Sequence, residues 1–178
     1  MVVAVGGQCR NVGKTSLICS LIEATRDTAW IAVKISRHRH GASIEGARLD
    51  EEFDRNTEND TGRFLRAGAA RAFWLRAPGD DMTPAAEHVR ELEKLSPVIV
   101  ESNSLRAAIR PDLYVVILDP RFEDFKTSAK NLGPLADAIV APDGGAPPLR
   151  EGQPVLRMTS GYNCPDLLAR LRDRLPVS

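Results

Sequence analysis

The chain has 178 residues, a length that suits one α/β domain. Its 24 basic and 24 acidic side chains balance to a formal charge of zero, which argues against general nucleic-acid binding. Cys9, Cys19 and Cys164 form no CxxC pair, so no disulfide framework is expected. No apolar stretch approaches the ~20 residues that span a bilayer, and the opening MVVAVGGQ indicates a strand rather than a signal peptide. We therefore expect a cytoplasmic protein with no membrane segment.

Short apolar runs alternate with helical patterns, which is typical of a parallel sheet covered by helices. Residues 2–5 form a first apolar strand, and apolar residues at helical spacing predict a helix that begins near Gly13. Thr83-Pro84 offers an N-cap and a first-turn proline for another helix, and Asn163-Cys164-Pro165 begins a last one. Further strands are predicted at residues 28–35, 72–75, 97–100, 113–118, 138–140 and 155–158. The prediction is a single three-layer α/β/α domain over residues 1–178, with a mainly parallel sheet of six to seven strands.

Residues 36–62 are polar and charged, without clear periodicity. The segment is too long for an idle connection in a compact domain, so we expect an inserted functional loop. We also expect it to be mobile without ligand and to become ordered when nucleotide, Mg²⁺ or a second substrate binds. The alternative is a static lid in which Leu49 and Phe53 pack permanently against the sheet.

The strongest motif is the sequence GGQCRNVGKT at residues 6–15, between the first strand and the first helix. Glycines let the backbone approach phosphate oxygens, Lys14 reaches the β- and γ-phosphates, and the Thr15 hydroxyl is a ligand for Mg²⁺. The following helix adds the partial positive charge of its N-terminus. This pattern predicts a phosphate loop (P-loop) that binds a nucleoside triphosphate. The predicted nucleotide-binding residues are Gly7, Arg10, Asn11, Val12, Gly13, Lys14, Thr15 and Ser16.

The spacing of this loop departs from the usual G-x-x-x-x-G-K-[ST] pattern. Gln8 stands where that pattern has its first glycine, and the nearest glycine is Gly7, one residue earlier. The spacing from Gly7 to Gly13, with Val12 before the second glycine, resembles the loop of dethiobiotin synthetase and its relatives.

Three further residues are predicted to meet this loop. In a doubly wound sheet, ligands collect at the carboxyl ends of the strands, and Lys14, Lys34 and Glu101 lie at or just past such ends. Mg²⁺ prefers hard oxygen ligands, which Thr15, Asp60 and Glu101 would supply. A solvated surface position is the alternative for Asp60, because four other acids are close in sequence. Lys34 is a candidate catalytic residue that contacts a terminal phosphate or a second substrate, with a solvated strand end as its alternative.

The order of these segments resembles protein B of molybdopterin-guanine dinucleotide biosynthesis. That family is similar at a Lys-His-x-His-His stretch, which corresponds to residues 34–40, at an Asp upstream of Lys-Ala-Gly-Ala, and at Val-Glu-Gly. The resemblance spans roughly residues 2–101. It implies a GTP-binding protein, and the related synthetases place a Thr, an Asp and a Glu around Mg²⁺. The chain departs from the family after Glu101, where Ser102 replaces the expected glycine.

Two features stay open. His38 and His40 share a face of an extended chain, which allows a metal pair, anion binding together with Arg37 and Arg39, or a solvated loop. No Asn-Lys-x-Asp guanine motif is present, so the residues themselves do not decide between ATP and GTP.

These observations favour three functions. The first is a slow GTPase or ATPase in molybdenum-cofactor biosynthesis, with Lys14 and Mg²⁺ neutralising the phosphate charge. The second is an ATP-dependent ligase or kinase of the dethiobiotin-synthetase type, with its substrate near Lys34. The third is a nucleotide-gated adaptor that binds another protein. The candidate ligands besides the triphosphate and Mg²⁺ are a small-molecule or pterin substrate and a protein partner or second copy of the chain.

Overall fold

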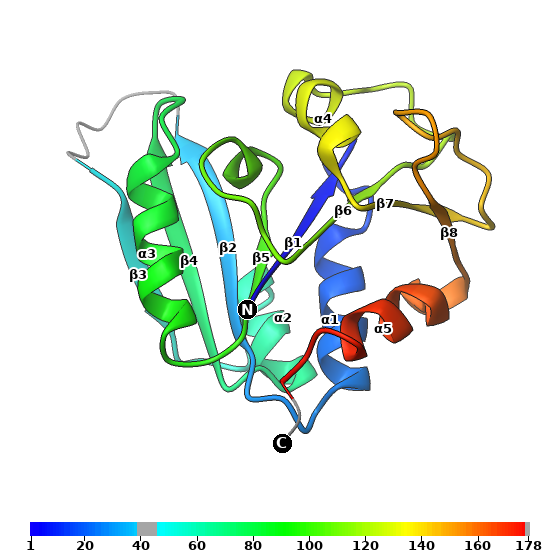
Figure 1. The fold of residues 1–178 in the computed structure, drawn as a ribbon. Helices are drawn as coiled ribbons and strands as arrows, with labels where there is room; N and C mark the ends of the chain where they lie inside the picture. Colours follow the sequence, from blue (N-terminus) through cyan, green and yellow to red (C-terminus); the bar gives the residue numbers. More distant parts are fainter. Residues whose placement is uncertain (39–45, 177–178) are drawn as a thin grey trace.

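The computed structural model describes residues 1–38 and 46–176, which form an eight-stranded sheet with helices on both faces (Figure 1). The strand order is β3-β4-β2-β5-β1-β6-β7-β8. Neighbouring strands are parallel except β3 and β4, which are antiparallel. The strands are β1 (Val2–Gly7), β2 (Ile31–His38), β3 (Arg48–Glu52), β4 (Arg71–Pro78), β5 (Val98–Glu101), β6 (Leu113–Ile117), β7 (Ala138–Pro142) and β8 (Val155–Met158). The helices are α1 (Lys14–Ala24), α2 (Asp60–Ala67), α3 (Thr83–Glu93), α4 (Thr127–Leu132) and α5 (Pro165–Arg172), with 3₁₀ turns η1 (Ser104–Ala107), η2 (Gly133–Leu135) and η3 (Ser160–Tyr162).

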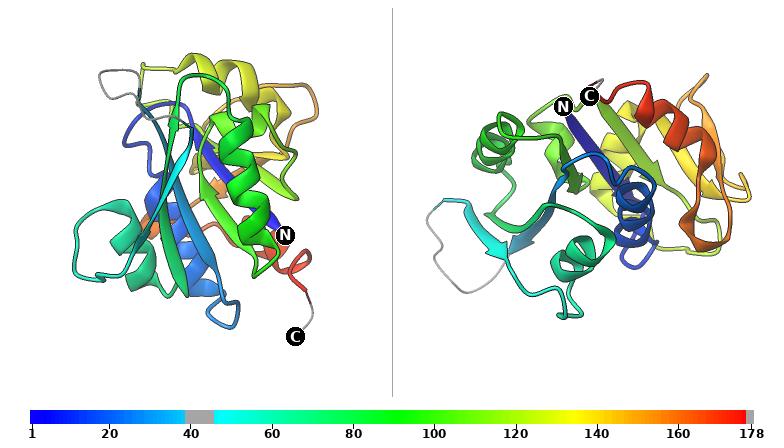
Figure 2. Two further views of the ribbon diagram at one scale, coloured as in Figure 1. Left: turned by 90° about the vertical axis from the view of Figure 1, so that its left-hand side faces the viewer. Right: turned by 90° about the horizontal axis from the view of Figure 1, so that it is seen from below.

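The central strand β1 is buried along its whole length because helices cover both faces of the sheet. Val3 and Val5 belong to the core shared with α1, α2 and α5. Val2 belongs to the core on the other face, which includes the apolar side of α3. Figure 2 shows α3 on one side of the sheet and α1 and α2 on the other, which makes the three layers visible. Among the described residues, no helix is long and apolar enough to cross a membrane.

The predicted three-layer domain with a mainly parallel sheet is confirmed, but the sheet has eight strands rather than six to seven. The additional strand is β3, at the edge of the sheet. Its sequence, RLDEE, lacks the apolar alternation that usually predicts a strand. Cross-strand ion pairs, rather than apolar packing alone, hold it to β4. Arg71 contacts Glu51 through two hydrogen bonds of 2.7 Å, and Arg76 pairs with Asp50. Charged residues on an edge strand also discourage pairing with another chain.

The segment 36–62 contains several regular elements. It includes the end of β2, all of β3 and the first residues of α2. Leu49 packs partly against the core under α3, whereas the Phe53 side chain is 81% exposed. Residues 39–45, within the segment predicted to become ordered on ligand binding, lie outside the described residues.

Candidate functional site

The phosphate loop connects β1 to α1 at the centre of the sheet, and its backbone requires glycine at Gly13. Gly13 has a φ of +102°, and a Cβ there would collide with the Tyr162 ring. Asn11 also has a positive φ, of 60°, which asparagine tolerates better than most residues. No side-chain hydrogen bond caps α1, so the N–H groups of its first turn remain available to an anion.

The side chains of Asn103 and Gln8 fix the loop to the segments that follow β5 and β6. Asn103, just after β5, accepts a hydrogen bond of 2.6 Å from the Gly7 N–H and donates one of 2.8 Å to the Gly7 carbonyl. Gln8 is buried, donates to the Phe122 carbonyl at 2.8 Å and accepts from the Asp119 N–H at 2.7 Å. The residue that breaks the usual glycine spacing therefore ties the loop to the connection after β6.

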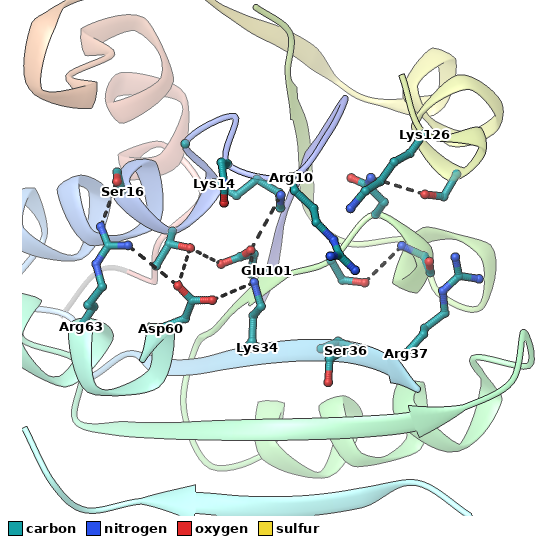
Figure 3. Close-up of a pocket in the computed structure, with 18 of the residues that line it drawn as sticks. Arg10, Lys14, Ser16, Lys34, Ser36, Arg37, Asp60, Arg63, Glu101 and Lys126 are labelled. Carbon is teal, nitrogen blue, oxygen red and sulfur yellow. Dashed lines mark hydrogen bonds and ion pairs between the residues drawn. The ribbon is translucent and has the colours of Figure 1, made fainter. Parts of the chain in front are cut away.

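Thr15, Asp60 and Glu101 bring three oxygen-bearing side chains together at the start of α1. The Thr15 Oγ1 lies 2.9 Å from Asp60 Oδ1 and 2.7 Å from Glu101 Oε2 (Figure 3). These residues come from the first turn of α1, the first residue of α2 and the last residue of β5. Glu101 is 2% exposed, so its carboxylate lies at the bottom of the site. Oxygen donors of this kind match the preference of Mg²⁺.

The Lys34 ammonium group lies between the same two carboxylates. Its Nζ is 3.0 Å from Asp60 Oδ2 and also pairs with Glu101. Lys34 and Glu101 are register partners on β2 and β5, which explains why their side chains meet. Burial lowers the pKa of Lys34, but the charges and hydrogen bonds of Glu101 and Asp60 outweigh it and raise the pKa above its usual range. The two neighbouring carboxylates repel one another, and a cation between them, here the Lys34 ammonium group, relieves this repulsion.

Lys14 lies on the other side of Glu101. Its Nζ donates a hydrogen bond of 3.2 Å to the Cys9 carbonyl within the loop and is 3.9 Å from Glu101 Oε1. Burial lowers its pKa, and the Glu101 carboxylate counteracts this only in part. A cation that is partly desolvated and incompletely paired is suited to bind a phosphate.

Helix α2 places Asp60 and a neighbouring arginine at the site. Its N-cap is Asn59, whose side chain accepts a hydrogen bond of 2.7 Å from the Gly62 N–H. Arg63, one turn after Asp60, donates a hydrogen bond of 2.9 Å to Ser16 Oγ on α1. Burial raises the pKa of Asp60, but Lys34, Thr15 and Arg63 outweigh this and hold it below its usual range. The Asp60 carboxyl is therefore ionised at neutral pH.

A pocket of about 990 Å³ opens at the carboxyl ends of the central strands and contains these groups. Such a volume is at the upper end of the range for small-molecule sites, roughly 300–1,000 Å³. Among the described residues, six cationic side chains line it against two carboxylates, Asp60 and Glu101, so this part of the lining carries an excess of positive charge. The six are Arg10, Lys14, Lys34, Arg37, Arg63 and Lys126.

Most of the residues predicted from the sequence lie in this pocket. They are Arg10, Asn11, Gly13, Lys14, Thr15, Ser16, Lys34, Asp60 and Glu101. Gly7 and Val12 instead shape the loop from below, because Val12 is buried and would collide with a Cβ at Gly7. His40 and the side chain of His38 lie outside what the structure describes, so their predicted roles remain predictions.

Several residues of the site were not assigned a role from the sequence. Asn103 and Lys126 reach the loop from distant segments, and no local motif marks them. One signal was available for Lys126, because the chain has only a few lysines among many arginines. Arg63 lies within the stretch that resembles the molybdopterin family, but the resemblance assigned it no function.

Scans against protein-family models and against curated protein sequences give no match. Solved structures do match. The hydrogenase maturation factor HypB from Archaeoglobus fulgidus aligns with a TM-score of 0.59 and 16% identity, covering 97% of this chain and 89% of that protein. HypB from Helicobacter pylori, solved in complex with nickel, aligns with a TM-score of 0.58 and 15% identity, covering 97% and 83%.

A third structure is LpxK from Aquifex aeolicus, solved in complex with ATP. It aligns with a TM-score of 0.52 and 18% identity over 92% of this chain, which spans 57% of the LpxK chain. At these identities the likeness concerns the fold alone. The chain has the P-loop NTPase fold, a single α/β domain with a mainly parallel sheet.

Proposed function

We propose that this chain binds a nucleoside triphosphate together with Mg²⁺ and hydrolyses it slowly. One observation carries the proposal: the Thr15 hydroxyl and the carboxylates of Asp60 and Glu101 meet within 2.9 Å, directly beside Lys14 in the phosphate loop. Local sequence places only Thr15 next to Lys14. The fold brings the two acids from distant segments to the same point, as a metal-assisted phosphate site requires.

The residues present fit a Mg²⁺ ion, because one hydroxyl and two carboxylates face one another and already attract the Lys34 ammonium. Thr15, Asp60 and Glu101 would hold the ion, directly or through water. Bound there, Mg²⁺ supplies positive charge to the β- and γ-phosphate oxygens.

The chain's own groups perform the remaining work of binding. The loop N–H groups and the first turn of α1 hold the phosphates, and Lys14 neutralises their charge from within the pocket. Lys34 pairs with Asp60 and Glu101, so a metal ion that takes these carboxylates would free its ammonium group to contact a terminal phosphate. Lys34 would then position the terminal phosphate through its charge, and no covalent bond to the protein is formed.

The pathway and the base are narrower proposals that rest on the sequence resemblance. Similarity to protein B of molybdopterin-guanine dinucleotide biosynthesis favours GTP and a place in molybdenum-cofactor biosynthesis. LpxK, the fold relative solved with ATP, shows that this architecture also accommodates adenine nucleotides. We therefore propose GTP as the first nucleotide to test and ATP as its competitor.

A second candidate function is phosphoryl transfer to a small substrate, as in a kinase or a ligase of the dethiobiotin-synthetase type. The observation that favours it is the size of the pocket, which extends beyond the loop to Arg37, Ser104 and Lys126. Nucleotide turnover would then depend on the added substrate. An adaptor would instead bind nucleotide with little turnover and bind a protein partner in one nucleotide state.

A binding and turnover panel separates these functions. ATP, GTP and their diphosphates are titrated by calorimetry with Mg²⁺ and with EDTA, and phosphate release is measured in the same samples. We expect tight triphosphate binding that needs Mg²⁺, with slow release of phosphate. Loss of binding in Lys14→Ala, but not in Lys94→Ala at the exposed C-cap of α3, assigns nucleotide binding to the loop. Equal binding of nucleotide by both variants would overturn the proposal.

A further inference from the structure

The pocket continues past the phosphate loop to the end of β2 and to the segments that follow β5 and β6. Arg37 at the end of β2, Lys126 before α4 and the serines Ser102, Ser104 and Ser128 line this part. Figure 3 shows Ser16 and α1 on one side of Glu101, and Arg37 and Lys126 on the other. Arg10 extends from the loop toward the same space.

The cations in this part of the pocket lack the carboxylate partners found around Lys34. Within the described residues, the side chains of Arg10 and Lys126 make no hydrogen bond and no ion pair. Arg37 has one ion pair, 2.7 Å to Asp80, whose side chain is largely exposed. Burial, then the positive charges of Arg10 and Lys34, lower the pKa of Lys126, and the nearby Asp124 does not reverse this. Cations that lie close together with few counter-ions favour the binding of an anion.

The nucleotide does not account for all of this charge. The lining that the structure describes has six cations and two carboxylates. A triphosphate with one Mg²⁺ brings a net charge of about −2, which leaves positive charge unmatched. Lys14, Lys34 and Arg63 pair with Asp60 or Glu101, whereas Arg10, Arg37 and Lys126 have no ion pair with these two carboxylates in the described part of the chain. Guanidinium groups and serine hydroxyls together suit a phosphate better than a single carboxylate, because they offer many donors to three oxygens.

We propose that Arg10, Arg37 and Lys126, with the adjacent serines, form a second anion subsite that takes the phosphate group of a small phosphorylated substrate beside the bound triphosphate. This inference deepens the proposed function, because it names the class of the second ligand. The inference also goes beyond the proposed function, since the subsite uses residues outside the Thr15–Asp60–Glu101 cluster. Arg10 would lie between the two phosphate positions, as the one cation in the subsite that the loop itself provides.

The test uses radiolabelled inorganic phosphate as the probe and equilibrium dialysis as the measurement. The protein is first saturated with Mg²⁺ and a non-hydrolysable triphosphate analogue, which fills the loop and blocks phosphate binding there. We expect saturable, stoichiometric phosphate binding to this loaded protein. The double variant Arg37→Gln, Lys126→Gln should bind phosphate at least about tenfold more weakly, because two charged donors are lost.

The control is the double variant Arg90→Gln, Lys94→Gln, which removes the same charge from exposed positions in the last turn and at the C-cap of α3. It should bind phosphate like the parent. The single variant Lys126→Gln provides an independent reading if the double variant is unstable. Absence of saturable phosphate binding, or equal binding by the parent and the Arg37–Lys126 variants, would overturn the subsite.

The two proposals fail separately in this experiment. Analogue binding is measured in the same samples, so a protein that binds no analogue refutes the proposed function. The subsite is then judged on phosphate binding to the free protein, where loss in the Arg37–Lys126 variants but not in Lys14→Ala supports it. Loss in Lys14→Ala alone would assign the phosphate to the loop and refute the subsite.

Discussion

The two ends of the pocket differ in how their charges are compensated. At the end formed by Thr15, Asp60 and Glu101, each carboxylate has a cation within reach, and Lys34 bridges both. At the end formed by Arg10, Arg37 and Lys126, the charges of Arg10 and Lys34 lower the pKa of Lys126, and Arg37 pairs with the largely exposed Asp80. Both ends share the phosphate loop and the carboxyl ends of the same sheet.

This difference shows what each end can bind. The carboxylate end attracts cations, so a divalent metal that displaces Lys34 from the carboxylates would keep them compensated. The cationic end gains by binding an anion, since Asp80 and Asp124 offset its positive charge only in part. A ligand with a metal at one end and phosphate groups at the other matches the whole pocket better than either ion alone. The following predictions test whether the two ends are separable.

The largest effect is expected from Lys14→Ala, because Lys14 lies beside Glu101 and faces both ends. We expect turnover to fall about 10²–10³-fold and triphosphate affinity to fall with it, since a preorganised charge at the phosphates is lost. The fold should survive, because the Lys14 side chain is not part of the apolar core. Calorimetry and phosphate release measure the effect, with Lys94→Ala as the control. Parent-like turnover in Lys14→Ala would show that the loop is not the reactive site.

Glu101→Gln tests the carboxylate end alone. The substitution removes the buried carboxylate and leaves Asp60 as the remaining acid beside Thr15. We expect the Mg²⁺ concentration for half-maximal activity to rise about 10–100-fold, as for loss of a group that holds a metal. Binding of phosphate at the cationic end should change little. Glu91→Gln, an exposed carboxylate on α3, is the matched control, and an unchanged Mg²⁺ titration in Glu101→Gln would make Glu101 a purely structural residue.

Sequence reasoning identified the parts of the site that local patterns specify. The phosphate loop is contiguous, so Lys14 and Thr15 could be assigned from their neighbours. Lys34 and Glu101 were placed from the rule that ligands gather at strand ends, and the structure makes them register partners. Asp60 had to be selected among several nearby acids, and the family resemblance rather than periodicity selected it.

The elements that escaped prediction depend on partners far away in the sequence. Strand β3 is polar because its ion pairs with β4 replace apolar packing. Asn103 was visible only as a departure from the family pattern after Glu101, yet it holds both backbone groups of Gly7. Lys126 enters the pocket from the connection after β6, which no motif in the sequence links to the loop.

Asn103→Ala is expected to affect both ends moderately, because Asn103 holds the loop between them. The variant leaves the Gly7 N–H without its acceptor, at a cost of about 1–3 kcal/mol in the free energy of unfolding. A less fixed loop should also weaken triphosphate binding about threefold to tenfold. Urea unfolding and calorimetry provide the two values, and Asn56→Ala at an exposed position is the control. A stable protein with unchanged affinity would remove Asn103 from the positioning residues.

The smallest effect on nucleotide binding is expected from Gln8→Gly, which restores the usual glycine spacing of the loop. Gln8 holds residues 119 and 122 through its side chain and receives the Lys126 N–H at its carbonyl, so it supports the cationic end from below. Its removal leaves the buried Asp119 N–H unpaired and adds backbone freedom, and we expect the free energy of unfolding to fall by about 2 kcal/mol.

The triphosphate affinity of Gln8→Gly should stay within about twofold of the parent's, because a glycine at position 8 can still wrap a phosphate. Phosphate binding to the nucleotide-loaded protein should weaken more than this, because the connection that carries Lys126 loses the hydrogen bonds from the Gln8 side chain to the Phe122 and Asp124 carbonyls. The matched control is Gln153→Gly, since Gln153 is also buried and also bonds the main chain, at Gly133, Ala136 and Leu149, but lies outside the pocket lining. If both variants lose the same stability and only Gln8→Gly loses phosphate binding, the two ends are separable. Equal loss of phosphate binding in both would mean that general destabilisation, rather than the support of Lys126, controls the cationic end.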